Sequence, residues 1–224
     1  HRKETIDGKT ICISGYGNVG CYFIEKANEL GAKVVTIADE FGYVYDPDGI
    51  KGEKLEYLKN LWTVYRESAE QYAKKFNLKW VPERCPWEVK CDIAVPTATQ
   101  NEIGKEDALN LVKNGCIAVC EGANMPSTPE AIDVFMQNNI AFGPGKAVNA
   151  GGVAVSGLEM SQNSMRLNWT REEVDKRLHQ IMKDIHSSVI TAADKYGSPG
   201  NYVNGANIAG FIKVANAMMD QGIV

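Results

Sequence analysis

A glycine pattern near the start of the chain has the spacing of a phosphate-binding loop. Gly15, Gly17 and Gly20 form G-x-G-x-x-G between a short apolar run and a helix-like stretch. In this context the first glycine allows a tight turn, the second lets the backbone approach a pyrophosphate, and the third lets helix pack on strand. The N–H groups at the start of such a helix favour a bound anion. The pattern therefore predicts a dinucleotide site, and the alternative is a glycine turn that binds nothing.

Two carboxylates follow at the distance where a ribose acceptor is expected. Asp39 and Glu40 close the next apolar run, 24 residues after Gly15. An acid at this place accepts a hydrogen bond from the adenosine ribose 2′-hydroxyl and would repel a 2′-phosphate. No Arg or Lys follows the pair closely. The pair therefore favours NAD, with NADP as the alternative, unless it is only a solvated acidic strand end.

Three segments that we expect at strand ends are rich in small and amide residues. They are residues 96–101, 121–126 and 144–152. In open α/β sheets, ligands bind outside the carboxyl ends of the strands, and an amide both donates and accepts, as a nicotinamide carboxamide requires. We therefore expect a bound ligand here, with local loop capping as the alternative. The residues concerned are Ala98, Thr99, Gln100, Gly122, Asn124 and Asn149.

Other chemistry-bearing residues give weaker patterns. His179 and His186 lie seven residues apart with no carboxylate or thiol at ligand spacing, so we expect no metal site. Lys146 follows Gly-Pro-Gly, which lacks the P-loop spacing. We expect packing roles for the remaining large aromatics, namely Trp80, Trp87 and Trp169.

Bulk composition narrows the class of protein. The net charge is −4, so the chain lacks the positive charge that is typical of nucleic-acid-binding proteins. No apolar run reaches the ~18 residues that a membrane-spanning helix needs. Residues 1–10 are polar, so we expect no signal peptide. Three of the six cysteines, Cys12, Cys116 and Cys120, lie in apolar runs, which favours reduced, packed thiols and a cytoplasmic location.

The elements that must position these residues alternate along the chain. Apolar, strand-like runs are found at residues 9–14, 33–38, 92–95, 116–120 and 140–142. Helical patterns are found at residues 18–30, 53–76, 105–113, 128–137, 170–196 and 207–220. This alternation predicts an α/β fold of the Rossmann type, a doubly wound and mostly parallel sheet with helices on both faces and a helical C-terminal segment. We expect the dinucleotide-binding domain at residues 5–200 and a C-terminal helix at residues 201–224.

Five strings of residues resemble one known family. The chain is similar to the hexameric, bacterial-type glutamate dehydrogenases, in their C-terminal coenzyme-binding half, and the strings separate it from leucine and phenylalanine dehydrogenases. The strings are ATQN at 98–101, EGANMP at 121–126, KAVNAGGV at 146–153, SGLEMSQN at 156–163 and YVNGANIAGF at 202–211.

The resemblance implies reversible oxidative deamination of L-glutamate to 2-oxoglutarate and ammonia, by hydride transfer to the nicotinamide. It also implies a homo-hexamer. Gly15, Gly17, Asn18 and Val19 would hold the pyrophosphate, and Gln100 and Asn124 would lie near the nicotinamide and its ribose. Asn149 would lie near nicotinamide and substrate, while Val153 and Ser156 would meet the glutamate side chain. In place of the basic residues that NADP-using members tend to carry, this chain has Trp62, Tyr65 and Ser68.

The chain departs from the family in what it lacks. The catalytic lysine and aspartate of the family lie in an N-terminal substrate domain, whose glycine-rich motif is not found here. We therefore expect no catalytic residue in this chain, nucleotide binding without turnover, and a C-terminal helix that packs on the missing domain. A stand-alone dinucleotide sensor and the coenzyme domain of another amino acid dehydrogenase are the alternatives. Ser156 argues against the last, since an aliphatic substrate needs no hydroxyl there.

Overall fold

The computed structural model describes residues 4–222, and the chain forms two compact units that divide between Phe142 and Gly143. The outer ends of the polar N-terminal stretch and of the C-terminal segment lie outside the described residues. The division differs from the expected boundary at residue 200, because α9 (Tyr202–Gln221) packs closely on α8 (Arg171–Lys195). Whether the C-terminal segment packs on a further domain stays a prediction.

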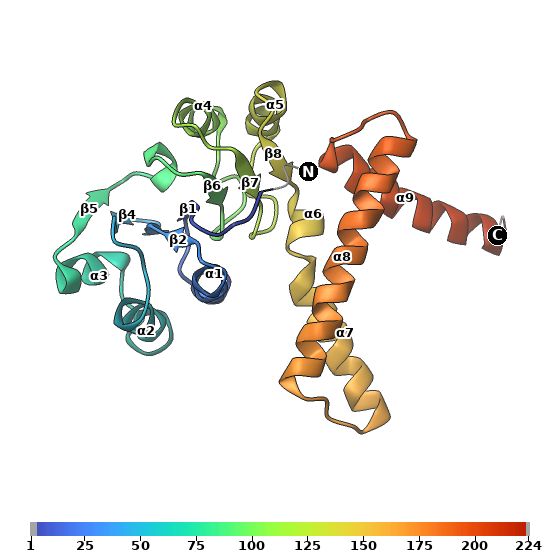
Figure 1. The fold of residues 1–224 in the computed structure, drawn as a ribbon, viewed down its shortest axis with the longest axis horizontal. Helices are drawn as coiled ribbons and strands as arrows, with labels where there is room; N and C mark the ends of the chain where they lie inside the picture. The colour runs from blue at the N-terminus through green and yellow to red at the C-terminus, as the bar shows by residue number, and fades with distance from the viewer. Residues whose placement is uncertain (1–3, 223–224) are drawn as a thin grey trace. The chain divides into compact units, whose positions relative to one another are not determined.

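The first unit is built on a five-stranded sheet in the order β2-β1-β6-β7-β8. Strand β1 pairs in parallel with both β2 and β6, and β6 pairs in parallel with β7. Helix α1 (Asn18–Glu29) covers one face, and α4 (Lys105–Lys113) and α5 (Pro129–Gln137) cover the other (Figure 1). The predicted Rossmann-type fold is thus confirmed. The strands are β1 (Thr10–Ile13), β2 (Lys33–Val34), β6 (Ile93–Val95), β7 (Ala118–Cys120) and β8 (Ala141–Gly143).

The single strand predicted at residues 33–38 is wrong, because the chain divides there between two sheets. After β2 it enters β3 (Thr36–Asp39), which pairs antiparallel with β4 (Gly42–Tyr45), and β4 pairs with β5 (Lys79–Pro82). The Thr36 hydroxyl donates to the carbonyl oxygen of Ile13 at 2.8 Å and accepts from its N–H at 2.9 Å. At this position a side chain therefore takes the place of backbone pairing with β1, and the Thr36 backbone pairs with β4, while Ala38 still forms a parallel bridge with Gly15.

The long helix predicted at residues 53–76 is also wrong. The structure has α2 (Glu53–Asn60), a π-helical turn η1 (Leu61–Tyr65) and α3 (Ala69–Phe76). Arg66 ends η1 in a left-handed conformation with φ of 55°. The Ser68 hydroxyl then accepts the N–H of Glu70 at 3.1 Å and starts α3. The apolar residues do follow helical spacing, but residues 66–68 include no Gly or Pro from which the break could be predicted.

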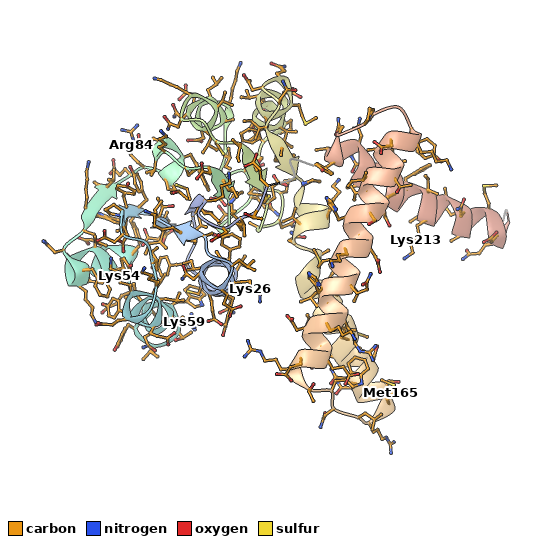
Figure 2. All side chains as sticks on the ribbon, viewed as in Figure 1. Lys26, Lys54, Lys59, Arg84, Met165 and Lys213 are labelled. Carbon is orange, nitrogen blue, oxygen red and sulfur yellow. The ribbon has the colours of Figure 1, made fainter. Side chains whose placement is uncertain are left out.

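The core of the first unit contains a buried charge cluster centred on Asp46. Asp46 is fully buried and accepts the Lys54 ammonium at 2.7 and 2.8 Å and the Tyr72 hydroxyl at 2.9 Å. Burial, followed by the charge of Asp46, raises the pKa of Tyr72 above its usual range. Lys54 lies on α2 (Figure 2) and Tyr72 lies on α3, so their bonds to Asp46 join both helices to the end of β4. The apolar core of the same unit includes Val44, Ile50, Leu55 and Leu58.

The second unit is helical and consists of α6 (Gly145–Val148), α7 (Ala150–Met165), α8 and α9. Helix α8 begins with a side-chain cap, because the Thr170 hydroxyl accepts the N–H of Glu173 at 3.2 Å. Helix α9 starts five residues earlier than predicted, where the Asn201 side chain accepts the N–H of Asn204 at 2.9 Å. None of the helices formed by residues 4–222 is both long and apolar enough to cross a bilayer.

Candidate nucleotide-binding site

The glycine loop closes tightly between β1 and α1. A Cβ on Gly20 would overlap the carbonyl oxygen of Gly15, so the start of α1 can pack on the turn only because Gly20 lacks a side chain. A Cβ on Gly15 would lie 2.9 Å from the carbonyl oxygen of Thr97, in the loop after β6. Gly20 thus has the packing role that the pattern predicts, and Gly15 in addition leaves room for the loop after β6. A Cβ on Gly17 would meet only the Trp62 ring, at 3.7 Å, so no protein atom requires glycine there.

The N-terminus of α1 is arranged to receive an anion. Gly17 is the N-cap and supplies no side-chain hydrogen bond, and the first turn contains no acidic residue. Asn18 and Val19 are exposed in that turn. The positive end of a helix dipole with uncapped N–H groups favours phosphate oxygens. The geometry therefore fits the predicted pyrophosphate site.

Two further loops meet at the carboxyl ends of β6 and β7. The N–H of Asn101 donates to the carbonyl oxygen of Met125 at 3.0 Å, and the N–H groups of Gly122 and Ala123 donate to Pro96 at 3.0 and 2.9 Å. A cavity of about 430 Å³ opens beside them. Its lining joins both predicted segments, with Ala98, Thr99, Gln100 and Asn124. Gly122 is half-buried behind this lining, and a Cβ there would press on Thr97 at 3.2 Å.

A carboxylate that the sequence interpretation missed supports the pocket. Glu102 accepts the N–H of Ala98 at 3.0 Å, and it also bonds to the Ser14 hydroxyl and the Thr99 N–H. The Ser14 hydroxyl in turn accepts the N–H of Thr97 at 2.9 Å, which connects the end of β1 to the pocket loop. Burial raises the pKa of Glu102 above its usual range, although these bonds oppose the shift. The partner Ser14 lies 88 positions before Glu102 in the sequence, and the pairing of β1 with β6 brings the two together. No local pattern therefore identifies Glu102.

The acidic end of β3 has a structural role in addition to the predicted one. Asp39 accepts the N–H of Phe41 at 2.9 Å and, with its other oxygen, the N–H of Ala69 at 2.8 Å. Each carboxylate oxygen retains a further lone pair for a ribose hydroxyl. Glu40 is exposed at the adjacent turn. The binding roles of Asp39 and Glu40 therefore stay predictions, while Asp39 also fixes the start of α3.

Two residues of the segment 61–69 contact the glycine loop, Trp62 through its side chain and Glu67 through its backbone. The Tyr16 hydroxyl donates to the carbonyl oxygen of Glu67 at 2.8 Å, and burial, followed by the charge of Asp39, raises the Tyr16 pKa above its usual range. The Trp62 Nε1–H donates to the Asn18 side chain at 3.3 Å. The family resemblance had singled out Trp62 in this segment, but not its contact with Asn18 or the contact of Glu67 with Tyr16.

The predicted substrate-side residues belong to the second unit. Asn149 joins α6 to α7 as the N-cap of α7. Val153 follows on α7 with 73% of its surface exposed, and the exposed Ser156 hydroxyl donates to the carbonyl oxygen of Gly152 at 3.3 Å. Lys146 is hydrogen-bonded to the Asn207 side chain, which ties α6 to α9.

The remaining candidates have packing roles. Trp87 is fully buried, and Arg177 lies 4.1 Å from the ring centroid of Trp169. His186 stacks on Tyr202 with ring centroids 5.8 Å apart, and His179 is exposed. Among residues 4–222 there is no group of three His, Cys, Asp or Glu side chains placed to hold a metal ion. Trp80 is half-buried against the core, and all six cysteines are free thiols.

Known proteins with the same sequence pattern carry dehydrogenase names. The chain matches the family described as Glutamate/Leucine/Phenylalanine/Valine dehydrogenase over residues 1–222. It is 58% identical to a glutamate dehydrogenase of Bacteroides thetaiotaomicron, over 98% of this chain and 49% of that protein. It is 55% identical to an NAD(P)-specific glutamate dehydrogenase of Xylanibacter ruminicola, over 99% of this chain and 50% of that protein. Other relatives are named NAD-specific or NADP-specific.

A solved structure named glutamate dehydrogenase superposes with a TM-score of 0.96 at 49% identity, covering 100% of this chain and 50% of that one. The chain thus spans about half the length of the relatives it matches. The sequence match, the sheet order and the glycine loop agree with one another. The chain belongs to the Glutamate/Leucine/Phenylalanine/Valine dehydrogenase family.

Proposed function

We propose that the chain is the coenzyme-binding half of a cytoplasmic glutamate dehydrogenase, and that it binds NAD in preference to NADP. The observation that carries the proposal is the uncapped N-terminus of α1, bordered by Gly15, Gly17 and Gly20. The pyrophosphate would lie there, the adenosine ribose near Asp39 and Glu40, and the nicotinamide near Gln100 and Asn124. The names of the relatives support a nicotinamide dinucleotide and leave the choice of coenzyme to experiment.

Each group of residues would have a distinct part in hydride transfer. When bound, the nicotinamide accepts or supplies the hydride, and the protein supplies binding and orientation. The α1 N-terminus would fix the phosphates, while the amide side chains of Gln100 and Asn124 would orient the nicotinamide end. The general acid or base would come from an N-terminal domain of the longer protein. The isolated chain would therefore bind nucleotide without turning over glutamate.

Binding is tested by titrating the purified chain with NADH and with NADPH while following nicotinamide fluorescence. We expect NADH to bind, and NADPH to bind at least tenfold more weakly (about 1.4 kcal/mol). Equal or tighter binding of NADPH would disprove the coenzyme preference and leave the site in place. If neither binds, the site proposed for this chain alone is wrong. Glutamate turnover restored by a separately made N-terminal half would then distinguish an enzyme half from a sensor module.

We also propose that Asn149, Val153 and Ser156 face L-glutamate or 2-oxoglutarate in the longer protein, a homo-hexamer in which residues 201–224 pack on the N-terminal domain. Ser156→Ala in that protein should raise KM for glutamate about tenfold or more, through loss of a hydroxyl to the γ-carboxylate. Ser161→Ala is the matched control, because Ser161 lies on the same helix and its hydroxyl also donates to the residue four positions earlier, at 2.9 Å. Equal KM values for the two variants would remove Ser156 from the substrate site.

A further inference from the structure

An arginine–tryptophan stack stands beside the glycine loop. The guanidinium carbon of Arg66 lies 4.9 Å from the ring centroid of Trp62. The Trp62 Nε1–H reaches the Asn18 side chain, and the same ring is the nearest protein group to a Cβ built on Gly17. Trp62 remains 38% exposed, although it borders the loop. The stack is therefore at the edge of the proposed dinucleotide site and open to solvent.

The backbone on the C-terminal side of Arg66 is anchored to the same edge. Glu67 accepts the Tyr16 hydroxyl, and the Ala69 N–H donates to Asp39 at the end of β3, both at 2.8 Å. Because neighbouring Cα atoms are about 3.8 Å apart, the Arg66 backbone lies one residue from the contact with Tyr16 and three residues from the contact with Asp39. Its φ of 55° is uncommon for a residue with a long side chain and costs free energy. These anchors hold that conformation.

The chemistry of Arg66 suits a phosphate monoester. A guanidinium is always charged, and its planar fork of donors matches phosphate oxygens, while stacking on an aromatic ring limits the side-chain freedom lost on binding. Among residues 4–222, Arg66 forms no ion pair with an Asp or Glu. Asp39, by contrast, already accepts two backbone N–H groups. Arg66 thus has fewer hydrogen-bonding and ionic partners within the protein than Asp39 has.

We propose that Arg66 binds the 2′-phosphate of NADP(H), and that it thereby limits the preference for NAD given by Asp39 and Glu40. The inference rests on the proposed function, since it names the residue that sets coenzyme choice at the same site. It also adds a cation to a site where the sequence indicated only the carboxylates of Asp39 and Glu40. Trp62 stands where a basic residue is expected in the order of the chain, and its ring lies against the guanidinium of Arg66.

The test compares two substitutions that remove the same charge. Arg66→Asn is suited to the site, because Asn adopts left-handed conformations more readily than most residues. Arg84→Asn is the matched control, in the loop between β5 and the short helix η2 (Pro86–Glu88) (Figure 2). We expect Arg66→Asn to raise the ratio of the NADPH Kd to the NADH Kd about tenfold or more, and Arg84→Asn to leave that ratio within about twofold. Arg66→Lys should fall between them, since Lys keeps the charge without the fork.

Two mononucleotides separate this inference from the proposed function. Adenosine 2′,5′-bisphosphate and AMP differ only by the 2′-phosphate, and Arg66→Asn should weaken binding of the first far more than of the second. If NADH binds but Arg66→Asn leaves the coenzyme ratio unchanged, or Arg84→Asn changes it equally, the role of Arg66 is disproved and the proposed function stands. If the unsubstituted chain binds none of these nucleotides, both are disproved together.

Discussion

The two units bury their side chains to very different extents. The first unit has a continuous apolar core that includes Ile11, Ile24, Ile37 and Leu58, all fully buried. In the second, α7 has no buried residue and α9 buries only Gly205, while Phe211 on α9 is 70% exposed. The proposed nucleotide site therefore lies on a scaffold with its own core. The proposed substrate face lies on helices whose apolar surface this chain leaves open, in agreement with the proposal that a further domain covers them.

Removing Asp46 should have the largest effect on stability. Asp46→Ala takes the buried partner from Lys54 and Tyr72, and breaking a buried pair costs about 3 kcal/mol or more of unfolding free energy. Urea unfolding with hydrogen exchange at β4 and α3 measures the loss. We expect the amides of α8 and α9 to exchange as before, which would show that the two units are stabilised separately.

A surface ion pair gives the control for this experiment. Lys26 and Glu29 pair at 2.8 Å on α1, with side chains 60% and 49% exposed (Figure 2). Lys26→Ala should change the unfolding free energy by less than about 0.5 kcal/mol, because water screens such pairs. If Asp46→Ala costs no more than Lys26→Ala, the first unit is not held together by its buried cluster.

A single glycine controls packing in the second unit. A Cβ on Gly205 would overlap the carbonyl oxygen of Val189 and would also lie 3.1 Å from the Ala193 side chain, so α9 approaches α8 through this position. Gly205→Ala should cost about 2 kcal/mol by forcing the helices apart. Faster hydrogen exchange in α9, with β1 and α1 unchanged, is the expected result.

Gly210, on the same helix, has free space where Gly205 is crowded. A Cβ there meets nothing within 4 Å, so Gly210→Ala should stabilise α9 by about 0.5–1 kcal/mol through helix propensity. Equal destabilisation by both substitutions would mean that α9 does not pack on α8 through Gly205.

Gly17 separates ligand binding from folding in the first unit. The structure has room for a Cβ at Gly17, so Gly17→Ala should leave the thermal midpoint nearly unchanged. It should weaken NADH binding about tenfold, or about 1.4 kcal/mol, because the methyl group would occupy the approach of the pyrophosphate. Gly104→Ala is the matched control, as Gly104 is also an N-cap glycine with space around it. Unchanged NADH affinity in Gly17→Ala would place the phosphates elsewhere.

The sequence predicted the repeating parts of the first unit well. Helix caps and strand ends are local signals, so α4, α5 and the glycine turn were found close to their observed bounds. The convergence of residues 98–100 with Asn124 also followed, because parallel strands bring their carboxyl ends to one edge. Those features depend on a few neighbouring residues and on one rule of sheet topology.

The missed parts depend on single long-range hydrogen bonds. The Thr36 hydroxyl divides an apolar run that reads as one strand, and Asp39 fixes the start of α3 from 30 positions away. Arg66, which lies against the Trp62 ring, is the left-handed residue at which the predicted long helix breaks. No periodicity encodes such contacts. The site could therefore be predicted where backbone loops build it, and not where distant side chains complete it.

The smallest expected effect concerns pH and compares two carboxylates of the first unit. Burial raises the pKa of Glu102 above its ordinary value near 4.5, so the folded chain holds that proton more tightly than the unfolded chain. Glu102 thus stabilises the fold less as pH rises from about 4.5 through the raised pKa. Glu102→Gln removes this dependence, and its stability relative to the unsubstituted chain should improve as pH rises across that window.

Glu130 at the start of α5 should behave in the opposite way. Its own backbone N–H and the Thr128 hydroxyl hold the pKa of this exposed carboxylate below its usual range. Its contribution is present above the unfolded pKa and is lost as pH falls, so Glu130→Gln should lose stability relative to the unsubstituted chain as pH rises. Urea unfolding at several pH values between about 4 and 7 gives both slopes. Slopes of the same sign would show that the Glu102 carboxylate is not desolvated behind the pocket loop, and would remove it as the support of Ala98.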